Sequence, residues 1–90
     1  MVYVDELFDC RAFNPPSCFK GWSCHMWADS LEELLAMAER IRMKREWLQN
    51  NRNGDFPHFY LTRRRRRAAR LCGAVQKSLK DHLRMLRGNA

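Results

Sequence analysis

The residues that could do chemistry are a run of five arginines, Arg63–Arg67, directly after a threonine, and two histidines, His25 and His58. Guanidinium groups bind phosphate through paired hydrogen bonds, and a helix that starts in such a run adds backbone N–H donors. Cations at a helix start oppose the helix dipole, so a bound anion would offset the repulsion. The run predicts a phosphate site, with a solvated arginine face as the alternative. Its predicted ligands are Thr62, Arg63, Arg64, Arg65 and Arg66.

The two histidines are the candidates for acid–base chemistry, because imidazole titrates near neutral pH. His25 and His58 fall on outward positions of two predicted strands, so they can converge on one side of a sheet with Trp27 and Tyr60 nearby. Asp29 is the predicted orienting carboxylate. The alternative is that each histidine is only a satisfied polar group on a strand. Two-histidine phosphoesterases need a hydroxyl residue two positions after each histidine, and Trp27 and Tyr60 do not meet that requirement.

Aromatic residues beside the cations extend the predicted ligand site. Trp47 and Tyr60 could stack a base above a held phosphate, and Gln49 could add a hydrogen bond. The cysteines and histidines lack the spacing of a zinc site, and the four glycines are isolated, so no nucleotide-binding glycine loop is present. We therefore predict no metal and no cofactor.

The elements that must position these residues follow from periodicity and turn signals. Val2–Val4, Trp22–Trp27, Pro57–Leu61 and Ala74–Gln76 are predicted strands. A loop is expected from Asp9 to about Gly21, and Asn50–Asp55 is expected to be a turn. Glu46–Gln49 is either a helix end or a short edge strand. The strands are short, so the predicted sheet is small.

Three helices are predicted between and after these strands. The first begins at Asp29 or Ser30 and repeats apolar residues through Ile41, and the second runs from Arg63 to Cys72 with Gly73 ending it. A C-terminal helix covers about residues 78–87, after which the last residues fray. The predicted fold class is α/β (α+β): one domain, residues 1–90, with three to four strands and two to three helices.

Composition limits the setting of this domain. The chain has 90 residues with 17 Lys+Arg against 10 Asp+Glu, a net charge of +7, so a phosphate-bearing partner is expected. A second basic cluster, Arg40–Arg45, is explained by the negative end of the first helix dipole. No apolar run is long enough to span a membrane, and the four cysteines read as reduced thiols. We expect a cytoplasmic protein that does not bind membranes.

Four stretches together resemble a known family. They are Met1–Asp5, Cys24–Asp29 with its Leu-Glu-Glu-Leu continuation, Arg45–Gln49, and His58–Val75. They are similar to the small phage and bacterial proteins called domain of unknown function 4031. The resemblance implies a compact α/β fold and often a phage origin, hence a host cytoplasm, and it implies no established activity. Positions shared with that pattern are His25, Asp29, Trp47, Gln49, His58, Thr62, Arg65 and Arg66.

Two positions depart from the family pattern. Tyr60 stands where the pattern has an acidic residue, and Arg64 stands where it has a small hydroxyl residue. Chemistry that needs the carboxylate would be lost in this chain, leaving binding only.

Three hypotheses follow. The first is a non-enzymatic module that binds a nucleotide or a nucleic-acid backbone. The second is a small histidine-dependent hydrolase or transferase acting on a phosphorylated substrate. The third is a phage protein that inhibits a host factor by protein contact. The oligomeric state is left open.

Overall fold

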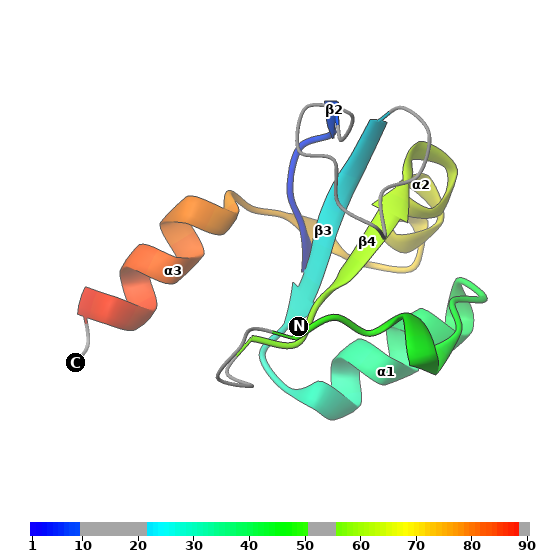
Figure 1. The fold of residues 1–90 in the computed structure, drawn as a ribbon, viewed down its shortest axis with the longest axis horizontal. Coiled ribbons are helices and arrows are strands. Elements are labelled where there is room, and N and C mark those ends of the chain that lie inside the picture. Colours follow the sequence, from blue (N-terminus) through cyan, green and yellow to red (C-terminus); the bar gives the residue numbers. More distant parts are fainter. Residues whose placement is uncertain (10–21, 51–55, 89–90) are drawn as a thin grey trace.

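A small mixed sheet organises the molecule (Figure 1). The computed structural model describes residues 1–9, 22–50 and 56–88. Sheet strands were predicted at four of the places where they occur, and Phe8–Asp9 is an additional short strand at the start of the predicted loop. The strands are β1 (Val2–Val4), β2 (Phe8–Asp9), β3 (Trp22–Ala28), β4 (Phe59–Thr62) and β5 (Val75–Gln76).

β3 is the centre of the sheet. β1 and β2 pair antiparallel with successive parts of one edge of β3, and β4 pairs antiparallel with its other edge. β5 lies parallel to β1, so the strands occupy four positions. β1, β4 and β5 therefore point the same way, and their carboxyl ends lie at one end of the sheet. Ligand sites in sheets with parallel strands are commonly built at that end.

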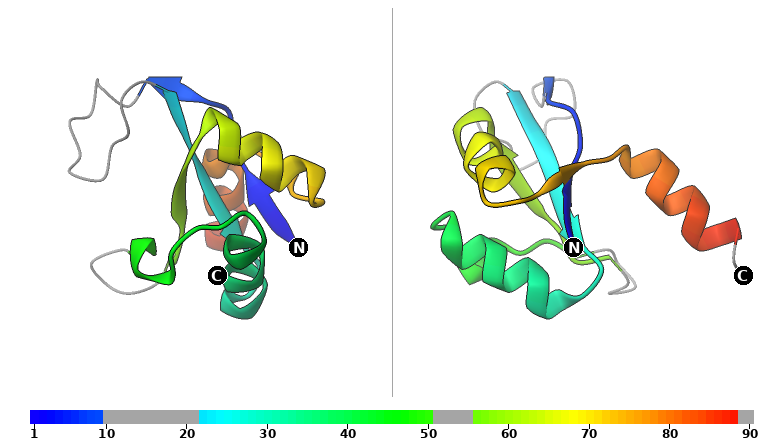
Figure 2. Two further views of the ribbon diagram at one scale, coloured as in Figure 1. Left: turned by 90° about the vertical axis from the view of Figure 1, so that its right-hand side faces the viewer. Right: turned by 180° about the vertical axis from the view of Figure 1, so that it is seen from behind.

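Three helices complete the fold, which confirms the predicted α+β class. α1 spans Leu31–Arg40, α2 spans Arg63–Leu71 and α3 spans Leu79–Gly88. α2 carries the chain from β4 at one edge of the sheet to β5 at the other (Figures 1 and 2). α3 extends away from the sheet beyond β1 (Figure 2).

All three predicted helix starts have side-chain caps, and in the third Ser78 Oγ accepts the N–H of Asp81 at 3.4 Å. Ser30 Oγ accepts the N–H of Glu33, and Thr62 Oγ1 accepts the N–H of Arg65 at 3.3 Å. Each cap satisfies one of the N–H groups that a first turn leaves without a helical partner.

The core lies between one face of the sheet and the helices α1 and α2. Strand residues at alternate positions supply it, as the period of two predicts: Val2, Val4, Cys24, Met26, Phe59 and Leu61 are buried there. Leu34, Met37 and Ala38 of α1 and Ala69 of α2 pack against them. The opposite face of the sheet, which we call the open face, carries the side chains of the two predicted histidines.

Some elements differ from expectation for local reasons. Glu46–Gln49 is neither an α-helix end nor a strand: Arg45–Trp47 forms a 3₁₀ turn, η2, and Gln49 makes a single bridge to His58. Leu31 is 47% exposed, because it opens the first turn of α1 and faces away from the sheet. Leu79 and Leu83 of α3 are only half-buried. The expected turn at 51–55, the expected loop at 10–21, Cys10 and Cys18 fall outside the described residues.

α1 and α2 end in the same way. In each helix the second residue after the last helical one has a positive φ, 62° for Arg42 and 103° for Gly73. The N–H of Met43 bonds to the Ala38 carbonyl at 2.8 Å, and that of Ala74 bonds to the Ala69 carbonyl at 2.9 Å. These are Schellman C-caps, which favour glycine at the positive-φ position. Gly73 was predicted there, whereas Arg42 was not.

The described cysteines are Cys24 and Cys72, and both are free thiols. Cys24 is fully buried, and burial raises the pKa of its thiol to about 12. Cys72 is exposed. Within residues 1–9, 22–50 and 56–88, none of the helices combines the length and apolar character needed to cross a bilayer.

Candidate functional site

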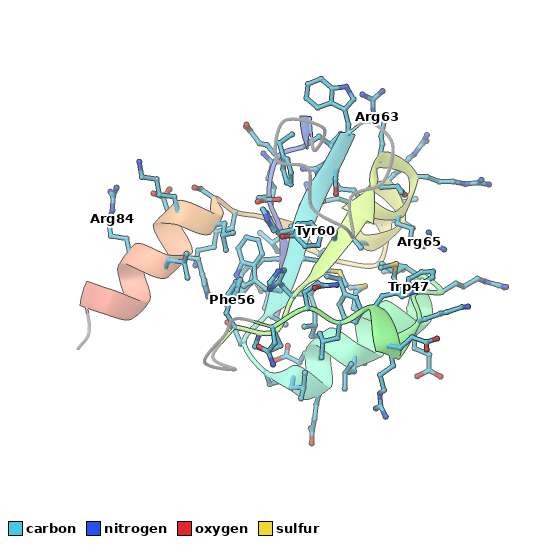
Figure 3. The ribbon with its side chains drawn as sticks, viewed as in Figure 1. Trp47, Phe56, Tyr60, Arg63, Arg65 and Arg84 are labelled. Atoms are coloured by element: carbon cyan, nitrogen blue, oxygen red, sulfur yellow. The ribbon has the colours of Figure 1, made fainter. Side chains whose placement is uncertain are left out.

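The two basic clusters of the sequence meet in the structure. Nη2 of Arg65 donates to the backbone carbonyl of Arg42 at 3.5 Å, and the Arg65 guanidinium lies over the Trp47 ring, 5.4 Å from its centroid. The ammonium of Lys44 lies 5.6 Å from the same ring. Figure 3 shows Arg65 and Trp47 close together on one side of the molecule. We call the combined set the basic surface: Arg42, Lys44, Arg63, Arg64, Arg65 and Arg67.

The start of α2 carries an unusual concentration of positive charge. Its first turn contains no acidic residue, and Arg63, Arg64 and Arg67 are exposed. Among the described residues, none of the five arginines forms an ion pair with a carboxylate. The positive end of the helix dipole lies at the same place. This end of α2 therefore attracts anions.

Arg66 differs from its four neighbours in the run. Its Nε donates to the Asp5 carbonyl at 2.9 Å, and its Nη2 donates to Oε1 of Gln76 at 2.8 Å. These bonds join α2 to the carboxyl ends of β1 and β5. Arg66 was predicted as a phosphate ligand, and in the structure it is half-buried with its guanidinium bonded to these two oxygens.

The predicted histidines lie together on the open face of the sheet. His25 of β3 is directly opposite Tyr60 of β4, and the His25 and His58 ring centroids are 5.9 Å apart. The Tyr60 ring lies 5.0 Å from that of His25 and 5.4 Å from that of His58. Phe8 stacks on the other side of His25 at 5.0 Å. Adjacent strands and alternation thus bring these side chains together, as the sequence predicted.

The carboxylate that orients His25 is Asp5. Nδ1 of His25 lies 2.7 Å from Oδ2 of Asp5, and the His25 backbone N–H donates to Oδ1 at 2.6 Å. Asp29, the predicted orienting residue, does not contact His25. It lies at the other end of β3, where it accepts the hydroxyl of Tyr3 at 3.0 Å. This hydrogen bond is the main reason that the pKa of Asp29 is lowered.

Asp5 could have been found from the sequence. Tyr3 and Asp5 alternate with the buried Val4, so they share the face of His25, and an acidic residue directly after an apolar strand is a common site signal. The exposed Trp22 at the start of β3 and the ring of Phe8 were also not among the predicted site residues.

His58 is held by its own backbone segment. Its Nδ1 lies 2.9 Å from the carbonyl of Phe56, and Gln49 pairs with it through two backbone hydrogen bonds of 2.8 and 2.9 Å. Burial lowers the pKa of His58 from its ordinary value. The Gln49 contact is a backbone contact, so the predicted hydrogen bond of its side chain to a ligand stays a prediction.

Trp27 was expected beside the histidines but is fully buried. Its ring lies 5.5 Å from His82 of α3 and 6.2 Å from Phe56. The Trp27 Nε1 atom and Nδ1 of His82 are buried and have no hydrogen-bond partner among the described residues. Trp27 therefore packs against α3 and does not line the histidine site.

No group of three or more His, Cys, Asp or Glu side chains with the arrangement of a metal site is found in the described part of the chain. The two imidazoles and Asp5 are a charged and polar set suited to proton transfer.

Comparison with known protein families gives one match, to a model described as a protein of unknown function (DUF4031), over residues 2–89. The chain belongs to the DUF4031 family. This confirms the predicted resemblance. Comparisons with curated proteins and with solved structures gave no match. In this DUF4031 member Tyr60 lies directly opposite His25, so its departure from the family pattern falls inside the histidine site.

Proposed function

We propose that this protein is a small nucleic-acid-binding module whose basic surface holds the phosphate backbone. The observation that carries the proposal is the position of Arg65. Its guanidinium spans from Trp47 to the carbonyl of Arg42, which joins the end of α1 to the start of α2. Two clusters of basic residues that are separate in the sequence thereby form one region of positive electrostatic potential, and such regions attract polyanions.

An extended ligand fits this surface better than a single nucleotide. The cations come from α2 and from the segment between α1 and η2, and Arg63, Arg64 and Arg67 are exposed. Two hollows of the described structure, of about 460 and 620 Å³, lie elsewhere, one beside Asp5 and Lys77 and the other between α1 and Arg45. Neither of these hollows is lined by a residue of the arginine run.

An aromatic side chain next to the arginines supports the same proposal. Trp22 is 49% exposed, and it precedes Ser23, which pairs with Thr62 at the start of α2. Trp22 therefore lies at the end of β3 that is next to the start of α2. Exposed tryptophan beside arginine is the combination that stacks a base while a phosphate is held.

The test is fluorescence anisotropy with a labelled single-stranded oligonucleotide at several salt concentrations. Each neutralised phosphate contributes about −0.7 to the slope of log K against log salt for a single strand. Arg63→Ala/Arg64→Ala should reduce the magnitude of the slope by about 1.4. Trp22→Ala should weaken binding, with a smaller effect on the slope, because stacking is less sensitive to salt.

Arg84→Ala is the matched control. Arg84 is exposed on α3, on the opposite side of the molecule from Arg65 (Figure 3), and its removal lowers the net charge by one, so the effects are compared per charge. The proposal is wrong if the oligonucleotide does not bind at low salt, or if Arg84→Ala lowers the slope as much per charge as the α2 substitutions. Displacement by ATP with a shallow salt dependence would instead indicate a single-nucleotide site.

A further inference from the structure

The two imidazoles on the open face share one feature of hydrogen bonding. Nδ1 of His25 faces the Asp5 carboxylate, and Nδ1 of His58 faces the Phe56 carbonyl, at 2.7 and 2.9 Å. Both partners can only accept, so each Nδ1 carries a proton and donates it. The remaining nitrogen, Nε2, is the atom of each ring that is left for proton exchange. A bond at Nδ1 that fixes ring orientation is typical of histidines that work through Nε2.

The distance between the rings suits one substrate group between them. Their centroids are 5.9 Å apart in an edge-on arrangement, and a hydrogen bond from each Nε2 adds roughly 3 Å. Two such rings can reach two different oxygens of a single phosphodiester. The His25 side chain is 21% exposed, so a ligand can reach it from solvent.

The histidine site is continuous with the proposed nucleic-acid surface. His58, Tyr60 and Thr62 alternate along the same face of β4, and Thr62 caps the helix that begins with the arginine run. On the other side, Gln49 pairs with His58 two residues after Trp47. A nucleic-acid strand bound to the basic surface would therefore pass close to both imidazoles.

We infer that His25 and His58 form an acid–base pair that cleaves RNA by transesterification. The inference rests on the proposed function, because the basic surface supplies the substrate. His58 Nε2 takes the proton as the 2′-O–H bond breaks and the 2′-oxygen bonds to phosphorus. The P–O5′ bond then breaks, and the 5′-oxygen takes the proton from Nε2 of His25. The products are a 2′,3′-cyclic phosphate and a 5′-hydroxyl end, and solvent restores both protons.

The surroundings favour this division of roles. Burial lowers the pKa of His58, which favours the neutral imidazole that can accept a proton. His25 has the Asp5 carboxylate against Nδ1, which balances the charge of the protonated ring that must donate. Among the described residues, the titratable groups that face the two rings are Asp5 from the segment after β1, Tyr60 from β4, and the other imidazole of the pair.

The experiment uses the full chain with a short single-stranded RNA labelled at its 5′ end, in buffer containing EDTA. Wild-type protein should release a fragment ending in a 2′,3′-cyclic phosphate, identified by mass spectrometry. A DNA strand of the same sequence should remain intact, because it lacks the attacking hydroxyl. The rate should show a bell-shaped pH dependence, since one imidazole must be neutral and the other protonated.

His25→Gln and His58→Gln should each lower the cleavage rate by at least about 100-fold. His82→Gln is the matched control, because it removes the third imidazole, which lies against Trp27 and Tyr3 instead. Cleavage that persists in His25→Gln/His58→Gln would overturn the inference, because it would come from another source. A rate that rises continuously with pH would also overturn it.

Binding measured on the DNA strand separates this inference from the proposed function. If the protein binds DNA but does not cleave RNA, the inference is overturned and the proposed nucleic-acid-binding function stands. If it neither binds DNA nor cleaves RNA, both proposals are overturned. If a glutamine variant fails to fold, Asp5→Asn tests the positioning role: it should lower the rate and narrow the alkaline side of the pH profile, which the proton donor His25 sets, while DNA affinity is kept. An unchanged profile in a folded Asp5→Asn protein would contradict the inference.

Discussion

Asp5 and His25 form a two-point contact across the sheet: one carboxylate oxygen lies 2.6 Å from the His25 backbone nitrogen and the other lies 2.7 Å from its ring Nδ1. The contact extends the pairing of β1 with β3 by one residue beyond Val4 and Met26. A single side chain thus fixes both the backbone and the ring of the neighbouring strand.

Asp5→Ala should therefore destabilise the fold. It removes a charged acceptor from two partly buried donors, which should lower the free energy of unfolding by about 2–3 kcal/mol. Urea denaturation at pH 7 measures this change. Glu6→Ala is the control, because Glu6 is the exposed acidic neighbour and its removal should change stability by less than about 0.5 kcal/mol. Equal effects of the two substitutions would show that the contact contributes nothing specific.

Stability should fall as the pH drops below neutral because of two histidines. Burial lowers the pKa of both His58 and His82 below the ordinary 6.5, so the unfolded chain binds more protons than the folded one between these values. The free energy of unfolding should then be highest above pH 6.5 and decrease toward pH 5. Urea midpoints at pH 5, 6, 7 and 8 measure the slope in roughly the range where histidine titrates.

His58→Gln removes one of these titrations and should flatten the slope, and His58→Gln/His82→Gln should flatten it further. A slope that is the same in the double variant as in the wild type would assign the pH dependence to other groups.

Arg66 should be the member of the arginine run on which stability depends. Arg66→Met keeps an unbranched apolar stem but removes the hydrogen bonds to Asp5 and Gln76, which should cost about 1–3 kcal/mol. Arg67→Met, one residue later and exposed, should change stability by less than about 0.5 kcal/mol. Thermal and urea unfolding of the two variants check this difference, and similar losses would contradict it.

The two Schellman caps predict opposite effects of glycine. Arg42→Gly should stabilise the protein by up to about 1 kcal/mol, because it relieves a side chain from a left-handed backbone. Gly73→Ala should destabilise it by about 1 kcal/mol, because alanine is strained at this positive φ. A steric clash does not contribute, since an added Cβ at Gly73 meets no other atom within 4 Å. Urea midpoints of the two variants report both signs. Stabilisation by Gly73→Ala would show that the backbone there is not strained by a side chain.

Local signals predicted most of the fold, because they depend on neighbouring residues. Alternation gave β1, β3 and β4, and Thr62 and Gly73 marked the start and end of α2. The 3₁₀ turn at Arg45–Trp47 was missed because a three-residue turn leaves no period to read. β2 was missed because two residues cannot show alternation.

The candidate site was only partly predictable, because its key contacts join distant residues. The meeting of His25 and His58 followed from their outward positions on strands that prove to be adjacent. The Asp5–His25 contact needed the register of β1 on β3, and the Arg65–Arg42 contact needed the packing of two helices. Alternation along the chain places Asp5 on the face of His25, but it encodes neither the register of β1 on β3 nor the packing of the two helices.

The length of the arginine run constrains how the chain can change. Thr62 fixes where α2 begins, and the fully buried Ala69 packs against the sheet six residues after Arg63. Loss of one arginine codon would rotate every later residue by about 100° around the helix axis and bring Arg70 to this buried position. Gain of one codon would bring Ala68 to the same position, which would still hold an alanine. A repetitive stretch of this kind is therefore more tolerant of lengthening than of shortening.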